Sequence, residues 1–177
     1  MKIFVDIFSG DELVSDTYPM KLVDDMIYEF TGKYEVRKHG DVVIEGANPS
    51  AEEADEGVDE SSESGIDIVL NHQLQEMALY SDLKMFKEYI KEYMGKLAKK
   101  LKEGGASDDD VKEFKKKMQE WVGALIKKER FKNLQFFAGP GENAAEGQLA
   151  ILEYRDVDGE EKPIFMFVKP GLREEKC

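Results

Sequence analysis

The sequence predicts an α+β fold in which a pair of helices is inserted as one unit between two groups of strands. Short segments with the alternation of β-strands occupy the first and last thirds of the chain, and two longer segments with helical spacing lie between them. A length of 177 residues fits a single domain, 1–177, which is long enough to bury a core.

The N-terminal third is expected to be β structure. Residues 1–8 alternate between apolar and polar side chains and lead into Ser-Gly-Asp-Glu, which predicts a strand followed by a turn. Residues 26–30 and 34–36 also alternate, and the Thr-Gly-Lys between them predicts a β-hairpin. Residues 42–44 predict one more short strand.

The segment 46–64 breaks this pattern. It holds almost no apolar side chain and no Lys or Arg, a composition typical of a mobile acidic loop. From residue 41 to residue 82 the chain carries twelve acids and no Lys or Arg. Three serines among these carboxylates are candidate phosphorylation sites for acidophilic kinases: Ser61, Ser62 and Ser64. The alternative is a solvated tether that only joins two strands.

Order is expected to return at 65–76, where alternate apolar residues share one face, and a helical hairpin is expected over 82–131. Ser81 is the expected N-cap of the first helix, and Ser107 with the three aspartates after it predicts the start of the second. The Gly-Gly pair between the two helices predicts an antiparallel arrangement. Apolar residues recur at helical spacing at Leu83, Phe86, Ile90, Tyr93, Met94, Leu97 and Leu101, and at Val111, Phe114, Met118, Trp121, Val122, Leu125 and Ile126.

The C-terminal third predicts strands again. Residues 133–138 predict one strand, and a glycine-rich loop follows it. Residues 148–168 predict two strands that are joined by a turn at Asp158 and Gly159.

Charge changes sign along the chain. The net charge is −13, yet residues 84–132 carry fifteen Lys and Arg against nine Asp and Glu. Lys84, Lys87 and Lys91 share one face of the first helix, which suits an acidic partner; a solvated helix face is the alternative. We do not expect nucleic-acid binding, because base-stacking aromatic residues are not interleaved with these lysines and the whole protein is anionic.

Several classes of protein are disfavoured. The chain holds no apolar run near 18 residues and no secretory pattern at its N-terminus, so we expect no membrane association and a cytoplasmic location. The single cysteine, Cys177, excludes an intramolecular disulfide and a Cys-rich zinc site. No nucleophile-and-base pair and no phosphate-binding loop is recognisable, so we do not expect an enzyme.

Five segments resemble the translationally controlled tumour protein family, and the resemblance covers essentially the whole chain. The segments are GANPSAEE at 46–53, IDIVLNHQLQE at 66–76, YIKEYMGKL at 89–97, FKNLQFF at 131–137 and KPGLREEKC at 169–177. One departure follows the fourth segment, where the family continues with a small residue, Gly and Glu. Pro140 stands at the position of that Glu, which is then represented by Glu142 after a local insertion.

The resemblance implies a small β-tent of mainly antiparallel sheets with a mobile acidic loop and an inserted long helical hairpin. It is similar to the fold of a Rab-binding GTPase chaperone, without the four zinc cysteines of that relative. The family also implies a cytoplasmic interaction protein that binds calcium and microtubules and supports growth and survival, an anti-apoptotic role. Tubulin, which has an acidic surface, would contact Lys84, Lys87 and Lys91. Calcium would bind weakly and without an EF-hand, and the residues do not identify its ligands.

A second function implied by the resemblance is regulation of a Ras-type or Rab-type GTPase, by guanine exchange or in a chaperone-like way. The contact surface would include Glu12, Leu74 and Glu142. A carboxylate there could compete for the Mg²⁺ of the nucleotide or for the lysine that binds its phosphates. The family also implies that Cys177 can form an intermolecular disulfide under oxidation, so we expect mostly monomer and a Cys177-linked dimer.

Overall fold

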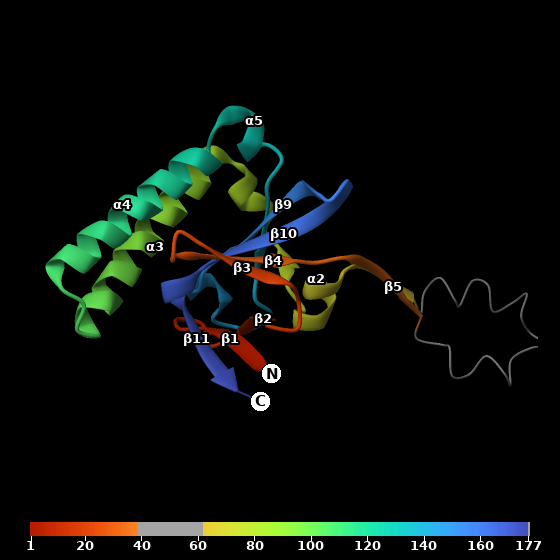
Figure 1. Ribbon diagram of the computed structural model, residues 1–177, viewed down its shortest axis with the longest axis horizontal. Helices are drawn as coiled ribbons and strands as arrows, with labels where there is room; N and C mark the ends of the chain where they lie inside the picture. Colours follow the sequence, from red (N-terminus) through yellow and green to blue (C-terminus); the bar gives the residue numbers. More distant parts are fainter. Residues whose placement is uncertain (39–61, 177) are drawn as a thin grey trace, which may run out of the picture.

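The computed structural model describes residues 1–38 and 62–176. Ser61, Cys177, the predicted strand at 42–44 and most of the predicted loop at 46–64 lie outside the described residues. The described part consists of three antiparallel sheets and a projecting pair of helices (Figure 1). This arrangement confirms the predicted α+β class.

The two ends of the described chain meet in a three-stranded sheet. Its strands are β1 (Lys2–Asp6), β2 (Glu12–Ser15) and β11 (Leu172–Lys176), in the order β11-β1-β2. The strand predicted at 1–8 is thus confirmed as β1. Strands β2 and β11 are missing from the sequence prediction, because β2 is only four residues long and β11 is mostly charged.

A six-stranded sheet lies at the centre, in the order β3-β4-β10-β9-β8-β7. Its strands are β3 (Met20–Val23), β4 (Ile27–Thr31), β7 (Gln75–Glu76), β8 (Gln135–Ala138), β9 (Ala150–Val157) and β10 (Glu160–Val168). The predicted hairpin over 148–168 is confirmed as β9 and β10. At its turn Asp158 and Gly159 have φ values of 54° and 87°, and a tight two-residue hairpin turn requires such positive values.

The predicted hairpin between 26–30 and 34–36 is wrong. Strand β4 pairs with β3 and β10, whereas β5 (Tyr34–Lys38) pairs with β6 (Ser62–Ile66) in a separate two-stranded sheet. Residues 62–64, which we assigned to the acidic loop, therefore belong to a strand. Alternation identified these strands but not their partners, which come from distant parts of the sequence.

Gly32 marks the point where the chain leaves the central sheet for β5. Its N–H donates a hydrogen bond to the carbonyl of Pro163 at 2.9 Å. A Cβ at this position would lie 2.9 Å from both Asp67 Oδ1 and a methyl carbon of Ile66, closer than a real Cβ allows. The close approach explains why the chain carries a glycine here.

The segment 65–76 was expected to alternate like a strand, but Asp67–His72 forms the short helix α2. The Asp67 carboxylate accepts hydrogen bonds from the N–H of Ile68 at 2.8 Å and of Lys33 at 3.0 Å. Ile68 is fully buried beneath it. Over such a short stretch, the same apolar residues can fit a strand or a short helix, so their periodicity does not distinguish the two structures.

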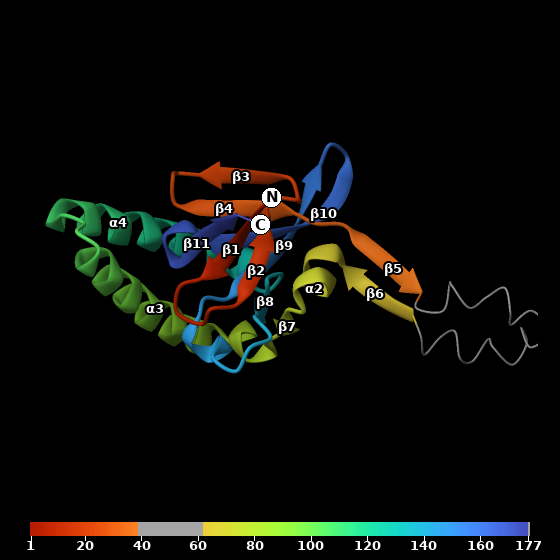
Figure 2. The ribbon, with the colours of Figure 1, turned by 90° about the horizontal axis from the view of Figure 1, so that it is seen from below.

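The predicted helical hairpin is confirmed. Helices α3 (Leu83–Glu103) and α4 (Asp108–Leu125) run antiparallel and form what we call the helical arm, and the short α5 (Lys128–Phe131) follows them. Figures 1 and 2 place the helical arm at one end of the molecule and the β5–β6 pair at the other.

Both long helices are capped by side chains. Ser107 Oγ accepts a hydrogen bond from the Asp110 N–H at 3.1 Å, and the Asp110 carboxylate accepts one from the Ser107 N–H at 3.3 Å, so the predicted cap is confirmed. The predicted cap of α3 is wrong by one residue. Asp82 caps this helix, while Ser81 ends the preceding 3₁₀ helix η2 (Ala78–Ser81).

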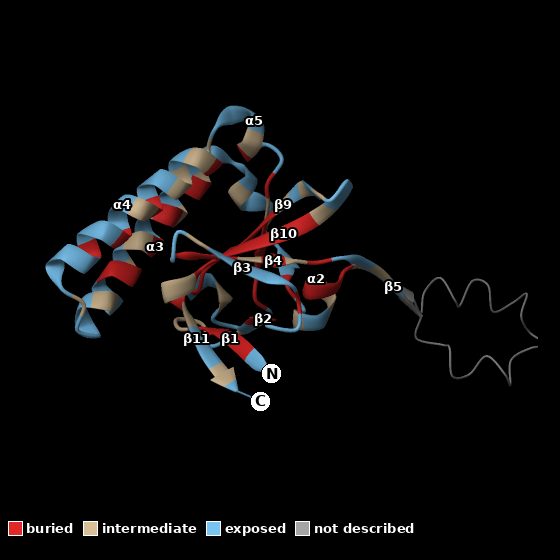
Figure 3. Cartoon of the chain, viewed as in Figure 1, coloured by how far each residue is buried: buried red, intermediate tan, exposed pale blue. Residues whose placement is uncertain are grey.

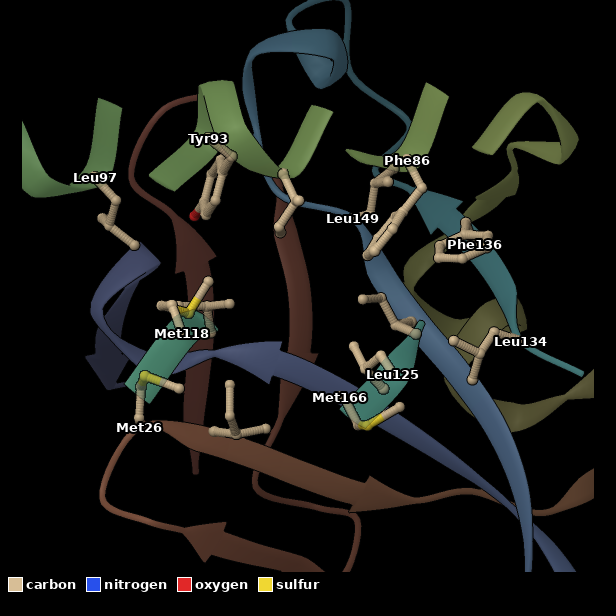
Figure 4. Packing of buried hydrophobic residues seen from close by; sticks show 14 of the residues in the cluster. Met26, Phe86, Tyr93, Leu97, Met118, Leu125, Leu134, Phe136, Leu149 and Met166 are labelled. Carbon is tan, nitrogen blue, oxygen red and sulfur yellow. The ribbon is translucent and has the colours of Figure 1, made fainter. Parts of the chain in front are cut away.

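The inner strands of the six-stranded sheet are packed on both faces, while the edge strands β3 and β7 are mostly exposed. One core cluster joins it to the helical arm, and Figure 4 shows Phe86, Leu97 and Met118 from the arm pointing toward the same core as Met166 of β10. The second cluster joins its other face to the three-stranded sheet and α2, through residues that include Phe4, Leu13, Phe30, Ile68, Leu152 and Phe165. Figure 3 shows the buried residues concentrated in the central strands and on the inner sides of the helical arm.

Candidate interaction surfaces

The turn between β1 and β2 meets the glycine-rich loop that follows β8. Asp11 Oδ1, in the turn, accepts a hydrogen bond from the N–H of Gly141 at 3.1 Å. Gly139 and Gly141 both lie against this carboxylate, so closely that a Cβ at either position would collide with it. The two glycines are therefore needed for the contact.

Asp6, at the end of β1, holds the other end of the same loop. Its side chain is fully buried and accepts hydrogen bonds from the N–H groups of Phe8 at 2.7 Å, Ser9 at 3.0 Å and Gln148 at 2.7 Å. Burial raises the pKa of Asp6, although the three N–H donors act in the opposite direction. We call Asp6 and Asp11 the aspartate clamp, because together they fix both ends of the loop 139–148.

The aspartate clamp brings two of the three expected GTPase-contact residues close together. Glu12 follows Asp11 and begins β2, and Glu142 follows Gly141; both side chains are exposed. Leu74 lies before β7, whose Gln75 pairs with Ala138 at the start of the loop, but its side chain is only 6 % exposed. Leu74 thus supports this region from the core and has little area to present to a partner.

His72, the last residue of α2, is influenced by the charge of Glu12. Burial lowers the pKa of His72, and the charges of Glu12 and Asp67 partly counteract that shift. Glu12 is therefore close enough to influence the histidine that ends α2.

The aspartate clamp is not among the sites predicted from the sequence. A signal for Asp6 was present, since an acid at the end of an apolar strand needs a polar partner if it is buried. The glycines around Pro140 were a signal for Asp11, because closely spaced glycines often mark a close approach of another group. Neither signal names its partner, which is more than a hundred residues away in the sequence.

The expected tubulin-contact residues lie on the helical arm. Lys84, Lys87 and Lys91 are all exposed, and none forms an ion pair with another residue of the described segments. By contrast, Lys96 on the same helix is held by Glu146 at 3.2 Å and lies over the ring of Phe8. Within the described segments, these three lysines thus carry exposed positive charge without an acidic partner.

A partly buried ionic network ties α5, which follows the helical arm, to the central sheet. Arg130 of α5 binds Glu153 of β9 through two hydrogen bonds, at 2.6 and 2.9 Å. Arg155 binds Glu153 at 2.8 Å and Glu29 of β4 at 2.9 Å. Burial alone would raise the pKa of Glu153, but the hydrogen bonds from both arginines outweigh it and lower that pKa.

The remaining predictions concern phosphorylation, the terminal cysteine, metal binding and membrane association. Ser64 is exposed in β6, Ser62 begins that strand, and Ser61 and Cys177 lie outside the described residues. Within 1–38 and 62–176 no three His, Cys, Asp or Glu side chains lie close enough together to hold a metal ion. No helix in the same part of the chain is long and apolar enough to cross a membrane.

Known proteins resemble this chain in sequence and in structure. The model of the family described as translationally controlled tumour protein matches residues 1–173. A translationally-controlled tumor protein homolog from Trichinella pseudospiralis is 65 % identical over 177 residues and covers 100 % of both chains. The homolog from Caenorhabditis elegans is 55 % identical, again over 100 % of both chains.

Two solved structures share the fold. The NMR structure of the Caenorhabditis elegans protein matches with a TM-score of 0.77 and 55 % identity, over 100 % of this chain and 99 % of that one. The translationally controlled tumor-associated protein from Schizosaccharomyces pombe also matches with a TM-score of 0.77, at 33 % identity and over 100 % of both chains. These likenesses confirm the resemblance drawn from the sequence, and the chain belongs to the translationally controlled tumour protein family.

Proposed function

We propose that this protein is a cytoplasmic interaction protein that associates with microtubules, binds calcium and supports growth and survival, without catalysing a reaction itself. The observation that supports microtubule association most directly is the row of exposed lysines on α3 that have no ion pair within residues 1–38 and 62–176: Lys84, Lys87 and Lys91. The helical arm projects from the sheets, so an acidic surface as large as that of tubulin could approach it (Figure 1).

Opposite charges attract over only about 8 Å at physiological ionic strength. An association that depends on these lysines should therefore weaken as salt is added. It should also weaken when the charges are removed, although removing exposed, unpaired lysines costs little stability.

Cosedimentation with microtubules at low and physiological salt tests this function. The variant carrying Lys84→Gln, Lys87→Gln and Lys91→Gln should pellet far less than the wild type at both salt concentrations. A control carrying Lys21→Gln, Lys128→Gln and Lys176→Gln loses the same charge from exposed positions away from α3 and should pellet like the wild type. Equal losses in both variants would show that only net charge matters, and no loss in either would refute a lysine-based contact.

Calcium binding rests on the family relationship and on the abundance of carboxylates, which are hard-cation ligands. A titration followed by amide shifts should reveal saturable changes at a limited set of residues. Magnesium, which demands a stricter geometry, serves as the comparison ion. Shifts spread evenly over all acidic residues would indicate screening by the ion and would refute a specific site.

We propose regulation of a small GTPase as the alternative function. It is supported by the hydrogen bond between Asp11 and Gly141, which holds the Glu12 turn beside the loop that carries Glu142. Two exposed carboxylates on adjacent segments could together contact the basic or Mg²⁺-binding groups around a nucleotide.

Release of labelled GDP from a Ras-type and a Rab-type GTPase tests this alternative. The wild type should accelerate release, and Glu12→Ala should remove that acceleration. Glu103→Ala, an exposed acid at the end of α3, is the matched control and should behave like the wild type. Unchanged release with the wild type would exclude exchange, and equal binding by the wild type and Glu12→Ala would exclude a contact through Glu12.

A further inference from the structure

A groove of about 660 Å³ lies where the chain passes from β4 to β5. Figures 1 and 2 show the end of the β9–β10 hairpin on one side of this segment and α2 on the other. The groove is lined by residues 17–19, 31–35 and 160–163, together with Ile66, Asp67, Asn71 and Tyr154. None of the expected tubulin or GTPase contacts belongs to it.

Aromatic and proline side chains line the groove. Tyr34 is 66 % exposed and Tyr154 is 46 % exposed, and both line the groove. Partial burial raises the pKa of Tyr154, with smaller contributions from Glu161 and Tyr34. Pro19 and Pro163 also line it, and Pro163 is buried. The groove thus offers flat apolar faces that the described residues leave uncovered.

The floor of the groove is already organised. The N–H of Gly32 donates to the Pro163 carbonyl at 2.9 Å, and the N–H of Asp67 donates to the Lys33 carbonyl at 2.8 Å. Asn71 donates to the Tyr18 hydroxyl at 2.7 Å. A ligand that enters a preformed site loses less free energy to ordering of the protein.

The rim carries more acid than base. Glu160 and Glu161 are exposed at the β9–β10 turn, and neither forms an ion pair with a residue in the described ranges. Lys33 is already paired with Glu35 at 3.8 Å, which leaves Lys162 as the unpaired base among the lining residues described. The free acids at the turn would attract a basic group.

We propose that this groove binds an extended, proline-containing segment of a partner protein with Arg or Lys at one end. Proline-rich segments adopt a polyproline II helix before they bind, and they dock on grooves lined with exposed aromatic rings. Tyr34 and Tyr154 supply the rings, and Glu160 and Glu161 bind the basic end and set the direction of the peptide. An acidic segment would be repelled by the two glutamates, and a helix would not present proline rings in extended form to the two tyrosines.

A fluorescein-labelled peptide with alternating leucine and proline residues and two arginines at one end is the probe, and binding is measured by anisotropy with the full-length protein. Tyr34→Ala and Tyr154→Ala should each weaken binding about tenfold, the loss expected for a central aromatic contact. Leu79→Ala removes an exposed apolar side chain elsewhere, at 54 % exposure, and should leave the affinity unchanged. Circular dichroism checks that each variant is folded.

A second pair of variants tests the charge at the rim. The variant with Glu160→Gln and Glu161→Gln should bind the peptide more weakly and lose most of its salt dependence. The variant with Glu92→Gln and Glu103→Gln changes the same charge on the helical arm and should bind like the wild type. When the two arginines of the peptide are replaced by glutamine, the difference between these variants should disappear.

Amide shifts of the wild-type protein keep the test independent of the variants. Addition of the peptide should shift residues 31–35 and 154–163 and leave the helical arm unchanged. Shifts elsewhere, no saturable binding at millimolar peptide, or equal effects of the groove and control variants would overturn the proposal. Light scattering tests whether a second copy of this chain occupies the groove instead. A dimer that Tyr154→Ala dissociates would assign the groove to that second copy and would also overturn the proposal.

Discussion

At the scale of single residues, two carboxylates organise a loop that has little regular structure of its own. Asp6 and Asp11 lie five residues apart in the sequence and hold opposite ends of the loop 139–148. Backbone N–H groups are the donors in every one of these contacts, so the loop is fixed by its main chain. The side chain of Glu142, by contrast, is exposed and faces solvent.

Asp6→Ala should destabilise the protein strongly. The substitution leaves three N–H groups without their acceptor, two of them partly buried and that of Gln148 fully buried, and each such loss typically costs about 1–3 kcal/mol. We expect a loss of about 3–5 kcal/mol in urea unfolding. Asp16→Ala is the control, because it removes one exposed hydrogen bond to Lys2, and should cost less than about 1 kcal/mol. Equal losses would contradict the anchoring role of Asp6.

Gly139→Ala should displace Asp11 from the loop. The added methyl group would occupy the space of the carboxylate, so the hydrogen bond to Gly141 would break. We expect a loss of about 1–3 kcal/mol in the free energy of unfolding, as in other overpacked sites, and amide shifts at residues 11, 12, 141 and 142. Gly95→Ala on the exposed face of α3 has no neighbour within 4 Å and should not destabilise. Unchanged shifts around residue 141 in Gly139→Ala would be evidence against the clamp.

At the scale of secondary-structure elements, the network around Glu153 couples three of them. It links α5, β9 and β4, so it fixes the base of the helical arm on the central sheet. The distal part of the arm depends instead on the cap at Ser107 and on the packing of α3 against α4. The two ends of the arm are therefore stabilised by different interactions.

Glu153→Gln should reduce stability in a way that depends on pH. Because the two arginines hold the pKa of Glu153 below its usual value of 4.5, the ionised carboxylate stabilises the folded state above that pH. The wild type should exceed the variant by about 1–3 kcal/mol at pH 7, and the difference should shrink as the pH falls from 4.5 through the lower pKa of the folded state. Urea unfolding at a series of pH values measures it. Glu175→Gln, whose pair with Arg173 is on the surface, should cost less than about 1 kcal/mol.

At the scale of the whole molecule, the two proposed binding surfaces lie on different elements. The three lysines lie on the first half of α3, whereas the groove lies beside β5, toward the end of the molecule that is away from the helical arm (Figure 2). The inner strands of the central sheet lie between them and pack against a core cluster on each face. We therefore expect the surfaces to act independently.

This independence can be measured. The variant with Lys84→Gln, Lys87→Gln and Lys91→Gln should bind the proline-containing peptide with unchanged affinity, within about twofold, because distant and unconnected sites contribute additively. Tyr154→Ala should likewise cosediment with microtubules like the wild type. A loss of either kind would reveal coupling through the sheet and would contradict the separation of the surfaces.

The parts predicted well are those whose signals are local. The helical arm follows from apolar spacing and from the cap at Ser107, and the β9–β10 hairpin follows from Asp158 and Gly159 at its turn. The parts predicted poorly depend on distant partners. The pairing of β5 with β6, the helix at Asp67–His72 and the buried role of Leu74 could not be derived from spacing alone.

Composition, periodicity and motif residues were enough to establish the α+β class, the helical arm, the uneven distribution of charge and the family. These properties depend on the type and local spacing of the residues, which can be read directly along a chain. The aspartate clamp, the pairing of strands and the groove between Tyr34 and Tyr154 were decided only by tertiary packing. Each joins residues that are far apart in sequence, and local spacing contains no information on which distant group will satisfy a buried carboxylate or cover an apolar face.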